Sequence, residues 1–421
     1  MTPHISGNKD SNYIKPDQHP LITPARVLFP LGLGTALSLM GDATLYTVLP
    51  THTADAGITL AAVGIILSAN RVIRLFLNGP IGILYDRSSR RRLFIPAIFI
   101  GALSTAIYAA WSGFWPLLTG RLLWGLAWVG IWVGGSTIIL DVTTDTDRGR
   151  WTGLYQTWFF LGLAIGAFSG GLLTDQLGYS STMWIGAFVT VLGGLIALFF
   201  LPETRPQKIV QQSQNEEISS LRFRPNREMI GVVTLQGINR FVTAGILAAT
   251  LALLVQDQLN SSNLLIGVAT LTGILLATRT ILSMFAAPMA GNLSDRLGNR
   301  WGVTFASLVI GSIGMLLLVR SEPIIILIGI CFSAIAGGSI QVLLTTRTGD
   351  MVEQAQRGKA IGLLHTAGDL GSALGPVTAY VLLRWLPLSG VYIMGAIMFA
   401  LGAILALLMY LQQRNSQNLY S

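Results

Sequence analysis

The sequence predicts an all-α integral membrane protein with twelve transmembrane helices, arranged as two parallel six-helix pseudo-repeats. Three observations support this: an apolar composition, twelve apolar runs of membrane-spanning length, and polar motifs that recur half a chain apart. Of the 421 residues, 52% are hydrophobic and 11% are charged, whereas an average soluble domain has about 25% charged residues. A soluble protein of this size would need more charge on its surface, so the composition excludes that class.

Apolar runs near 20 residues long recur along the chain, and each can cross about 30 Å of hydrocarbon. The first run is too long for a signal peptide, so we interpret it as an uncleaved helix. Runs one to six form the first copy of the repeat, and runs seven to twelve form the second. The expected helices cover residues 25–50, 60–85, 93–112, 114–140, 150–175, 181–201, 229–255, 263–291, 301–319, 323–346, 358–383 and 388–411.

Polar segments divide the chain into two six-helix bundles, a linker and two tails. The expected boundaries are an N-terminal tail at 1–24, a first bundle at 25–201, a linker at 202–227, a second bundle at 228–412 and a C-terminal tail at 413–421.

The net charge of +8 is a signal of topology. Most Lys and Arg residues lie in the tails, in the loops that follow even-numbered helices, and at the adjoining helix ends. Only Arg320 and Arg384 lie in the other set of loops. This positive-inside pattern predicts a multi-pass protein of the inner or plasma membrane with both termini in the cytoplasm. The basic excess therefore does not indicate a nucleic-acid partner.

One charged decapeptide occurs twice. GILYDRSSRR begins at Gly82, and GNLSDRLGNR begins at Gly291, 209 residues later. Because each copy holds an even number of helices, the copies have the same orientation and are related by an axis along the membrane normal. The same offset relates Asp86 to Asp295, Arg87 to Arg296, Asp141 to Asp350, and Arg148 to Arg357.

These motifs resemble those of the major facilitator superfamily of secondary transporters, and the resemblance covers the whole chain. Ser89 replaces a glycine of the family's loop motif, G-x-L-x-D-R-x-G-R-[RK], and the second copy has Asn299 where a basic residue is usual. The D/E-x6-R-G signature follows at Asp141–Gly149 and Asp350–Gly358, and PET stands at Pro202–Thr204. The first loop motif is matched at Gly82, Leu84, Asp86, Arg87, Arg90 and Arg91.

The resemblance implies that the repeated charges form gates between helix ends. Carboxylates and guanidiniums at those ends can pair when one side of the protein closes and part when it opens. The alternative is that these charges only flank helices and set the topology. The gating residues are Gly82, Asp86, Arg87, Arg90, Arg91, Asp141, Arg148, Gly291, Asp295, Arg296, Asp350 and Arg357.

The fifth expected helix carries a stripe of glycines. They follow the family's antiporter motif, G-x8-G-x3-G-P-x2-G-G, with Ala167 in place of the proline. The resemblance to the twelve-helix drug:proton antiporter branch implies export. The alternative is general packing of small residues, which lets neighbouring helices approach closely. The motif residues are Gly153, Gly162, Gly166, Gly170 and Gly171.

Polar residues inside the apolar runs are the candidate substrate site. Each ionisable group costs at least about 2.5–3.5 kcal/mol in hydrocarbon, so each is a functional hypothesis. The alternative for each arginine is a structural contact to a backbone carbonyl, and Arg71 and Arg279, at nearly equivalent positions, are expected to share a structural role. The candidates for the cavity are Asp42, Arg71, Arg74, Arg121, Trp124, Trp128, Asn239, Arg240, Arg279 and His365.

Depth along the helices predicts two ion pairs. At 1.5 Å per residue, Arg74 and Asp369 lie at matched depth in helices that face each other across the two halves in this family. Asp42 and Arg121 are expected to pair within the first half. Trp124, Trp128 and Trp132, four residues apart, form a stacking wall or, as we favour, a packing stripe.

We expect a proton-coupled exporter of a small amphipathic organic molecule. Asp42 is favoured as the proton-coupling carboxylate, and Asp369, with His365 one turn before it, is the alternative. Other interpretations are an importer or exchanger of an organic anion that uses the buried arginines, and a non-transporting receptor or scaffold. The expected partners are the substrate, protons and the lipid bilayer, and the protein is expected to be a monomer. The sequence shows no nucleotide-binding loop and no metal-ligand cluster, so we expect no enzyme activity, cofactor or metal.

Overall fold

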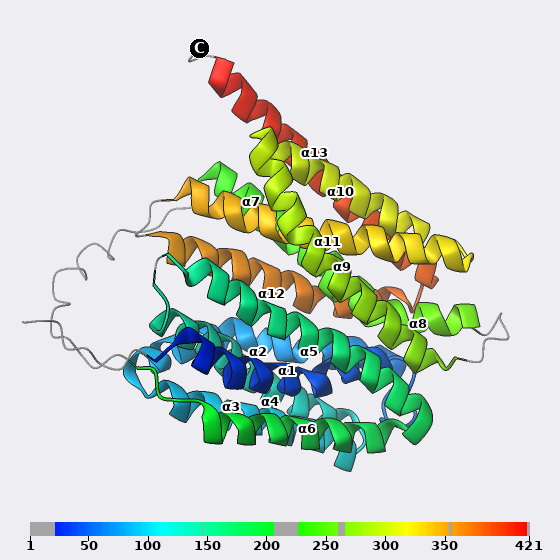
Figure 1. Ribbon diagram of the computed structural model, residues 1–421. Helices are drawn as coiled ribbons and strands as arrows, with labels where there is room; N and C mark the ends of the chain where they lie inside the picture. Colours follow the sequence, from blue (N-terminus) through cyan, green and yellow to red (C-terminus); the bar gives the residue numbers. More distant parts are fainter. Residues whose placement is uncertain (1–21, 145, 206–225, 260–265, 353–355, 419–421) are drawn as a thin grey trace, which may run out of the picture.

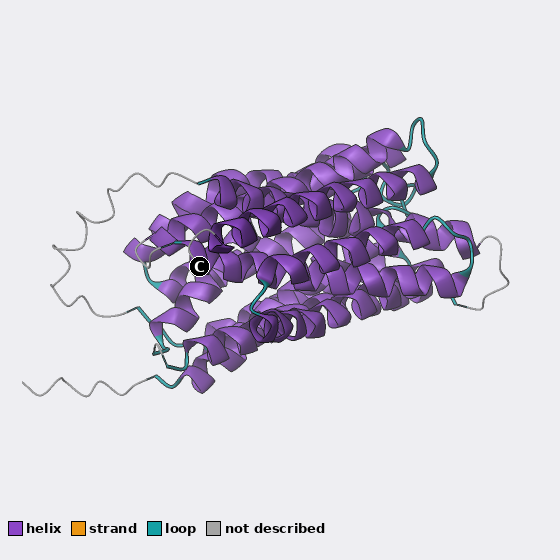
Figure 2. Cartoon of the chain, turned by 90° about the horizontal axis from the view of Figure 1, so that it is seen from above, coloured by secondary structure: helices purple, strands orange, loops and turns teal. Residues whose placement is uncertain are grey.

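The computed structural model describes residues 22–144, 146–205, 226–259, 266–352 and 356–418, and these form a bundle of long helices. Figure 1 shows the first six helices, blue to green, beside the remaining ones, and Figure 2 shows that the helices run along one common direction. The first half contains α1 (Pro24–Val48), α2 (Leu60–Arg87), α3 (Arg90–Ala110), α4 (Phe114–Asp141), α5 (Arg148–Leu177) and α6 (Tyr179–Phe200).

The second half has one irregular span. Its first crossing is divided into α7, a π-helical segment η2, and α8. The elements are α7 (Arg227–Arg240), η2 (Phe241–Leu247), α8 (Ala248–Leu259), α9 (Val268–Leu297), α10 (Arg300–Leu317), α11 (Pro323–Met351), α12 (Arg357–Leu382) and α13 (Leu388–Asn418).

The predicted membrane-spanning fold is confirmed. In the described chain, eleven helical spans are long and apolar enough to cross a membrane, and one of them, Arg227–Asp257, runs through α7 and η2 into α8. The twelfth span is α12, which is 26 residues long but less apolar, because it includes His365, Thr366 and Asp369. The less apolar span is therefore one of those that carry functional candidates, His365 and Asp369.

The two halves approach closely where glycines remove side chains. A Cβ at Gly64 of α2 would lie 2.8 Å from the carbonyl oxygen of Pro376 in α12. Gly171 of α5 lies against the carbonyl of Ala269 in α9 in the same way. Helices α2 and α12, and α5 and α9, therefore form the main contacts between the halves, as expected for small-residue packing in membranes.

The predicted antiporter glycines have different packing roles. Gly162, Gly166 and Gly170 each pack against α1, where an added Cβ would clash with Ala36, Met40 or Thr44. Gly171 faces the other half. A Cβ at Gly153 would meet open space, so packing in this state does not require that glycine.

We call the end at which α2, α4 and α6 finish the motif end, and the end at which α1, α3 and α5 finish the opposite end. At the opposite end a carboxylate joins the halves. Asp175, near the end of α5, accepts hydrogen bonds from the backbone N–H of Thr270 at 2.7 Å and from its hydroxyl at 2.6 Å. Ala269 N–H lies 3.4 Å from the same carboxylate. Asp175 thus caps the first turn of α9, where free N–H groups and the helix dipole favour a negative charge.

Replacing Asp175 by alanine is expected to loosen the opposite end. Hydrogen bonds to a charged group contribute about 1.5–3 kcal/mol each, so losing them should raise the population open at that end by about tenfold or more. The measurement is the rate at which an impermeant maleimide labels a cysteine placed at Ala249, which is buried in a cluster that both halves share, in a Cys331→Ser background. Asp175→Asn is the matched control, because asparagine is an equally good N-cap. Equal labelling rates in the protein that keeps Asp175 and in the Asp175→Ala variant would contradict the role of Asp175 in closing the opposite end.

Candidate functional site

The predicted ion pair between the halves is present. The guanidinium of Arg74 in α2 lies 2.7 Å from the carboxylate of Asp369 in α12. Asn78, one turn further along α2, donates to the second carboxylate oxygen at 3.4 Å. Asp369 therefore contacts the first half through both oxygens, although it belongs to the second half. The sequence prediction of this pair from matched depth is confirmed.

Two other arginines bind the π-helical segment. Arg71 of α2 donates to the carbonyl of Ala244 at 2.9 Å and to that of Ser372 at 2.7 Å. Arg279 of α9 donates to the carbonyl of Thr243 at 2.7 Å. The shared structural role expected for Arg71 and Arg279 is confirmed, since both guanidiniums are held by backbone carbonyls.

The π-helical segment itself begins directly after Arg240. The hydrogen bond from the N–H of Ala248 to the carbonyl of Thr243 spans five residues, and such wide turns occur often at functional sites. Arg71 and Arg279 reach successive carbonyls of this segment, one from each half of the protein. The irregular backbone is thus stabilised by two cations.

The predicted pair between Asp42 and Arg121 lies within the first half. Arg121 is fully buried and contacts the carboxylate of Asp42 in α1. Its Nε donates to the carbonyl of Ile66 at 3.3 Å. The ring of Tyr46 lies 5.2 Å from both the Arg121 and the Arg71 guanidinium carbon atoms. This pair therefore belongs to the packed interior of one half.

The remaining polar candidates lie on α7 and α12. Asn239 is buried and donates to the carbonyl of Gly337 at 3.2 Å. His365 is exposed, and no hydrogen bond joins it to Asp369 among the interactions of the described residues. Gln236 of α7 donates to Gln341 of α11 at 2.7 Å. Sequence reasoning missed this amide pair because it searched the apolar runs mainly for ionisable groups.

The tryptophans of α4 form a packed column. Trp124 and Trp128 stack with ring centroids 6.0 Å apart, and Trp128 and Trp132 with centroids 5.7 Å apart. Trp124 is 2% and Trp128 is 7% exposed, and both belong to the hydrophobic core of the first half. Trp124 packs against Gly101 of α3. This is the packing stripe that the sequence favoured, and the assignment of Trp124 and Trp128 to the cavity does not fit their burial.

At the motif end of the first half, the repeated charges form a network inside one half. Arg90 pairs with Asp141 at 2.8 Å. The carboxylate of Glu203, in the PET stretch, accepts from the hydroxyl of Ser89 and from the backbone N–H groups of Arg90 and Arg91, at 3.0 and 3.3 Å. Glu203 therefore caps the N-terminus of α3, a role that sequence reasoning did not assign.

The second copy repeats this arrangement with its own residues. Arg300 pairs with Asp350 at 2.6 Å and with Asp295 at 3.1 Å. Glu228 contacts Arg347 and accepts from the indole N–H of Trp301 at 3.2 Å. These carboxylates and guanidiniums bridge helix ends within each half, as the motif spacing predicted in outline.

Among the described residues, three other predicted gating residues, Asp86, Arg87 and Arg296, have no such bridge. All three are exposed. Added Cβ atoms at Gly82 and Gly291 would meet open space. Arg148 has an interaction partner, and the side chain of Arg357 lies outside the described part of the chain.

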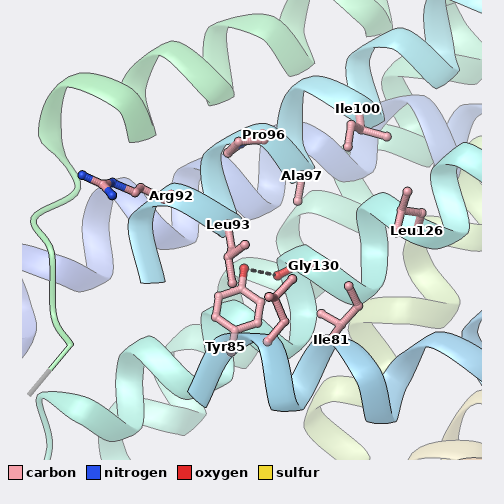
Figure 3. A pocket seen from close by; sticks show the side chains of 10 residues that line it. Ile81, Tyr85, Arg92, Leu93, Pro96, Ala97, Ile100, Leu126 and Gly130 are labelled. Atoms are coloured by element: carbon pink, nitrogen blue, oxygen red, sulfur yellow. Dashed lines mark hydrogen bonds between the residues drawn. The ribbon is translucent and has the colours of Figure 1, made fainter. Parts of the chain in front are cut away.

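A hollow on the first half lies beside its motif-end network, since it is lined by Tyr85, whose backbone carbonyl accepts from Arg90 (Figure 3). It is formed by α2, α3 and α4, and its lining is apolar apart from Tyr85 and Arg92. The hydroxyl of Tyr85 donates to the carbonyl of Gly130 at 2.8 Å, as the dashed line in Figure 3 shows. None of the predicted cavity residues lines this hollow, so the candidate site is the charged contact between the halves.

Comparisons with known proteins agree with this architecture. The family model described as Major Facilitator Superfamily matches residues 31–269 and again residues 233–419. An uncharacterized MFS-type transporter of Methanocaldococcus jannaschii is 23% identical over 374 residues, covering 88% of this chain and 94% of the relative. The class E tetracycline resistance protein of Escherichia coli is 26% identical over 325 residues, covering 75% and 76%.

A solved structure has the same fold. It is a bacterial homolog to the human lysosomal transporter Spinster in an inward-facing and occupied conformation, with a TM-score of 0.74. The alignment covers 93% of this chain and 97% of that chain at 16% identity. At this identity the likeness concerns the fold alone.

A charge swap tests whether Arg74 and Asp369 form one unit. Removing either partner leaves the other charge buried and uncompensated, which costs about 3–5 kcal/mol. Arg74→Asp and Asp369→Arg should therefore each lower the melting temperature of the purified protein, and the double swap should recover part of that loss. A double swap as unstable as the sum of the single changes would show that the two sites act independently.

The Glu203 cap predicts a dependence on pH. Partial burial alone would raise the pKa of Glu203, but the hydrogen bonds from Ser89 and from backbone N–H groups outweigh it and lower that pKa. A lowered folded-state pKa means that the stabilisation is present above the ordinary glutamate range, about pH 4.3, and is lost as the pH falls through the folded-state value. Melting curves of wild type and Glu203→Gln should therefore differ at pH 7 and converge in acid. A constant difference would contradict the cap.

Proposed function

Because the chain belongs to the major facilitator superfamily, we propose that it exports a small amphipathic organic molecule across a cell membrane in exchange for protons. The protein is a multi-pass secondary transporter and not an enzyme. The basic residues at the motif end support an orientation with that end in the cytoplasm. The relative named for tetracycline resistance supports the outward direction, since a membrane transporter protects a cell from a drug by moving it out.

The ion pair between Arg74 and Asp369 is the observation that carries the proposal. In this family transport moves one half against the other, so an ion pair that joins α2 to α12 at 2.7 Å must change as the halves move. Separating the pair while Asp369 stays charged would leave a buried carboxylate, which is costly. Protonation of Asp369 removes that cost. Proton uptake and the movement of the halves would then be linked at one residue.

The position of Asp369 supports it as the coupling acid over Asp42. Asp42 pairs with Arg121 inside one half, and Arg121 is fully buried there. A movement of one half against the other does not by itself separate two residues of the same half. His365, an exposed imidazole, lies one turn before Asp369 on the same helix. Asp42 remains the alternative carboxylate.

The proposal is tested in inverted membrane vesicles with an imposed pH gradient. A panel of small amphipathic molecules is offered, and uptake into the vesicles is measured with and without the gradient. Accumulation that depends on the gradient and on the protein supports proton-coupled export. Equilibration without accumulation for every molecule that moves would contradict proton coupling.

Asp369→Asn should separate transport from coupling. Since the amide cannot ionise, we expect accumulation driven by the pH gradient to be lost, while exchange of substrate down its own gradient continues. Both Asp369→Asn and Asp42→Asn should lower the melting temperature, because Arg74 and Arg121 lose their counter-charges, but Asp42→Asn should keep the accumulation driven by the pH gradient. Glu322→Gln is the control, because it removes a carboxylate in an exposed loop and should change neither accumulation nor melting temperature. If Asp369→Asn still accumulates substrate and Asp42→Asn does not, Asp42 is the coupling acid.

A further inference from the structure

Four arginines meet at the contact between the halves, and three of them have acceptors. Arg74 has Asp369, Arg71 has the carbonyls of Ala244 and Ser372, and Arg279 has the carbonyl of Thr243. The fourth is Arg240, the last residue of α7. In the part of the chain that the structure describes, its guanidinium has no hydrogen-bond or ion-pair partner.

The charges around Arg240 do not neutralise it. Arg71, Arg74 and Arg279 act on Arg240 as like charges, and Asp369, the nearby carboxylate, is already bound to Arg74. An ionised group without a counter-charge in an apolar span is costly. The surroundings of Arg240 therefore favour a negative charge that the chain itself does not supply.

A second polar group lies beside Arg240. A Cβ at Gly368 of α12 would lie 3.3 Å from Cγ of Arg240 and 3.2 Å from Nε2 of Gln236, so the two side chains flank one point. Gln236 is 1% exposed, and its Oε1 is buried with no hydrogen-bond partner. An unpaired buried amide oxygen is an acceptor that requires a donor.

The pseudo-repeat gives no structural reason for these residues. At the equivalent positions of the first half stand Leu31 and Val27, both fully buried apolar residues of its core. The scaffold thus folds without a cation or an amide at these positions. Arg240 also stands directly before the π-helical segment, where the carbonyls of Ala244 and Thr243 already accept from Arg71 and Arg279.

We infer that Arg240 binds the anionic group of the transported molecule, and that Gln236 accepts a hydrogen bond from a hydroxyl or N–H group next to it. The substrate class is therefore an organic acid with a donor beside its carboxylate or phosphate. A guanidinium suits this task because its fork of N–H donors matches a carboxylate or phosphate in two contacts. Gly368 leaves room for both side chains on the facing helix.

Binding of three matched probes to the purified full chain tests the inference. Mandelate has a carboxylate and an adjacent hydroxyl, phenylacetate lacks the hydroxyl, and mandelamide lacks the charge. We expect the wild type to bind mandelate most tightly and mandelamide most weakly, measured by calorimetry and by the rise in melting temperature. Losing a hydrogen bond to a charged group corresponds to about tenfold or more in affinity.

Variants assign the effect to the two residues. Arg240→Gln should weaken mandelate and phenylacetate by about tenfold or more without weakening mandelamide, and Arg240→Lys should keep part of the affinity. Gln236→Leu should make mandelate and phenylacetate bind alike. Arg320→Gln, an exposed loop cation, controls for loss of general positive charge and should change nothing.

The melting temperature without ligand separates binding from a structural role. Arg240→Gln removes an unpartnered cation, so it should be at least as stable as wild type, whereas Arg279→Gln loses a hydrogen bond to Thr243 and should be less stable. A loss of stability in Arg240→Gln as large as that in Arg279→Gln would overturn the inference. So would equal affinity for acids in wild type and Arg240→Gln, or no binding of either acid to the wild type.

An anionic lipid offers the same chemistry from another source. Vesicles of phosphatidylglycerol added to the purified protein form a separate arm, and stabilisation by this lipid alone, lost in Arg240→Gln, would overturn the assignment to a transported acid. The inference rests on the proposed function only in that the acid is the transported molecule. These binding measurements use no pH gradient, so a failure of proton coupling and a failure of Arg240 to bind acids give different results.

Discussion

A cation inside an apolar span must find an acceptor, and this requirement shapes the centre of the protein. Arg71, Arg74 and Arg279 find their acceptors in three different ways: in backbone carbonyls of the other half, in a carboxylate of the other half, and in a carbonyl of the same half. Because Arg71 and Arg74 bind acceptors across the contact, the two bundles are held together by charge as well as by packing. A movement of one half against the other has to exchange these partners.

Close approach of the backbones makes such short contacts feasible. Arg71 reaches Ser372 and Ala244 because α2 lies directly on α12, where Gly64 packs against the carbonyl of Pro376. The π-helical segment widens the backbone at the same level and presents carbonyls to both sides. Glycine packing and the irregular backbone thus act together: they bring backbone carbonyls within reach of the arginines, and these carbonyl dipoles take the place of counter-ions.

The two copies of the repeat share their ends and differ in their interiors. At the motif end, Arg90 with Asp141 and Arg300 with Asp350 perform the same task in each half. Deeper in the membrane, the first half buries Arg121 against Asp42, whereas the second half has Ile330 and Leu251 at those positions, both in its core. The shared charges therefore belong to the scaffold, and the unshared charges give the contact between the halves its chemistry.

The sequence by itself determined the twelve spans, the repeat, the pairs Arg74–Asp369 and Asp42–Arg121, and the common role of Arg71 and Arg279. These followed because helical rise converts residue number into depth and because an offset of half the chain relates the copies. Only the tertiary structure decided which arginine lacks a partner, that Trp124 and Trp128 pack inside one half, and that Asp175 and Glu203 cap helices distant in sequence. The physical reason is that residue number predicts how deep a side chain lies in the membrane. Which partner it meets also depends on the rotation of each helix about its axis and on irregular backbone such as η2, and depth predicts neither.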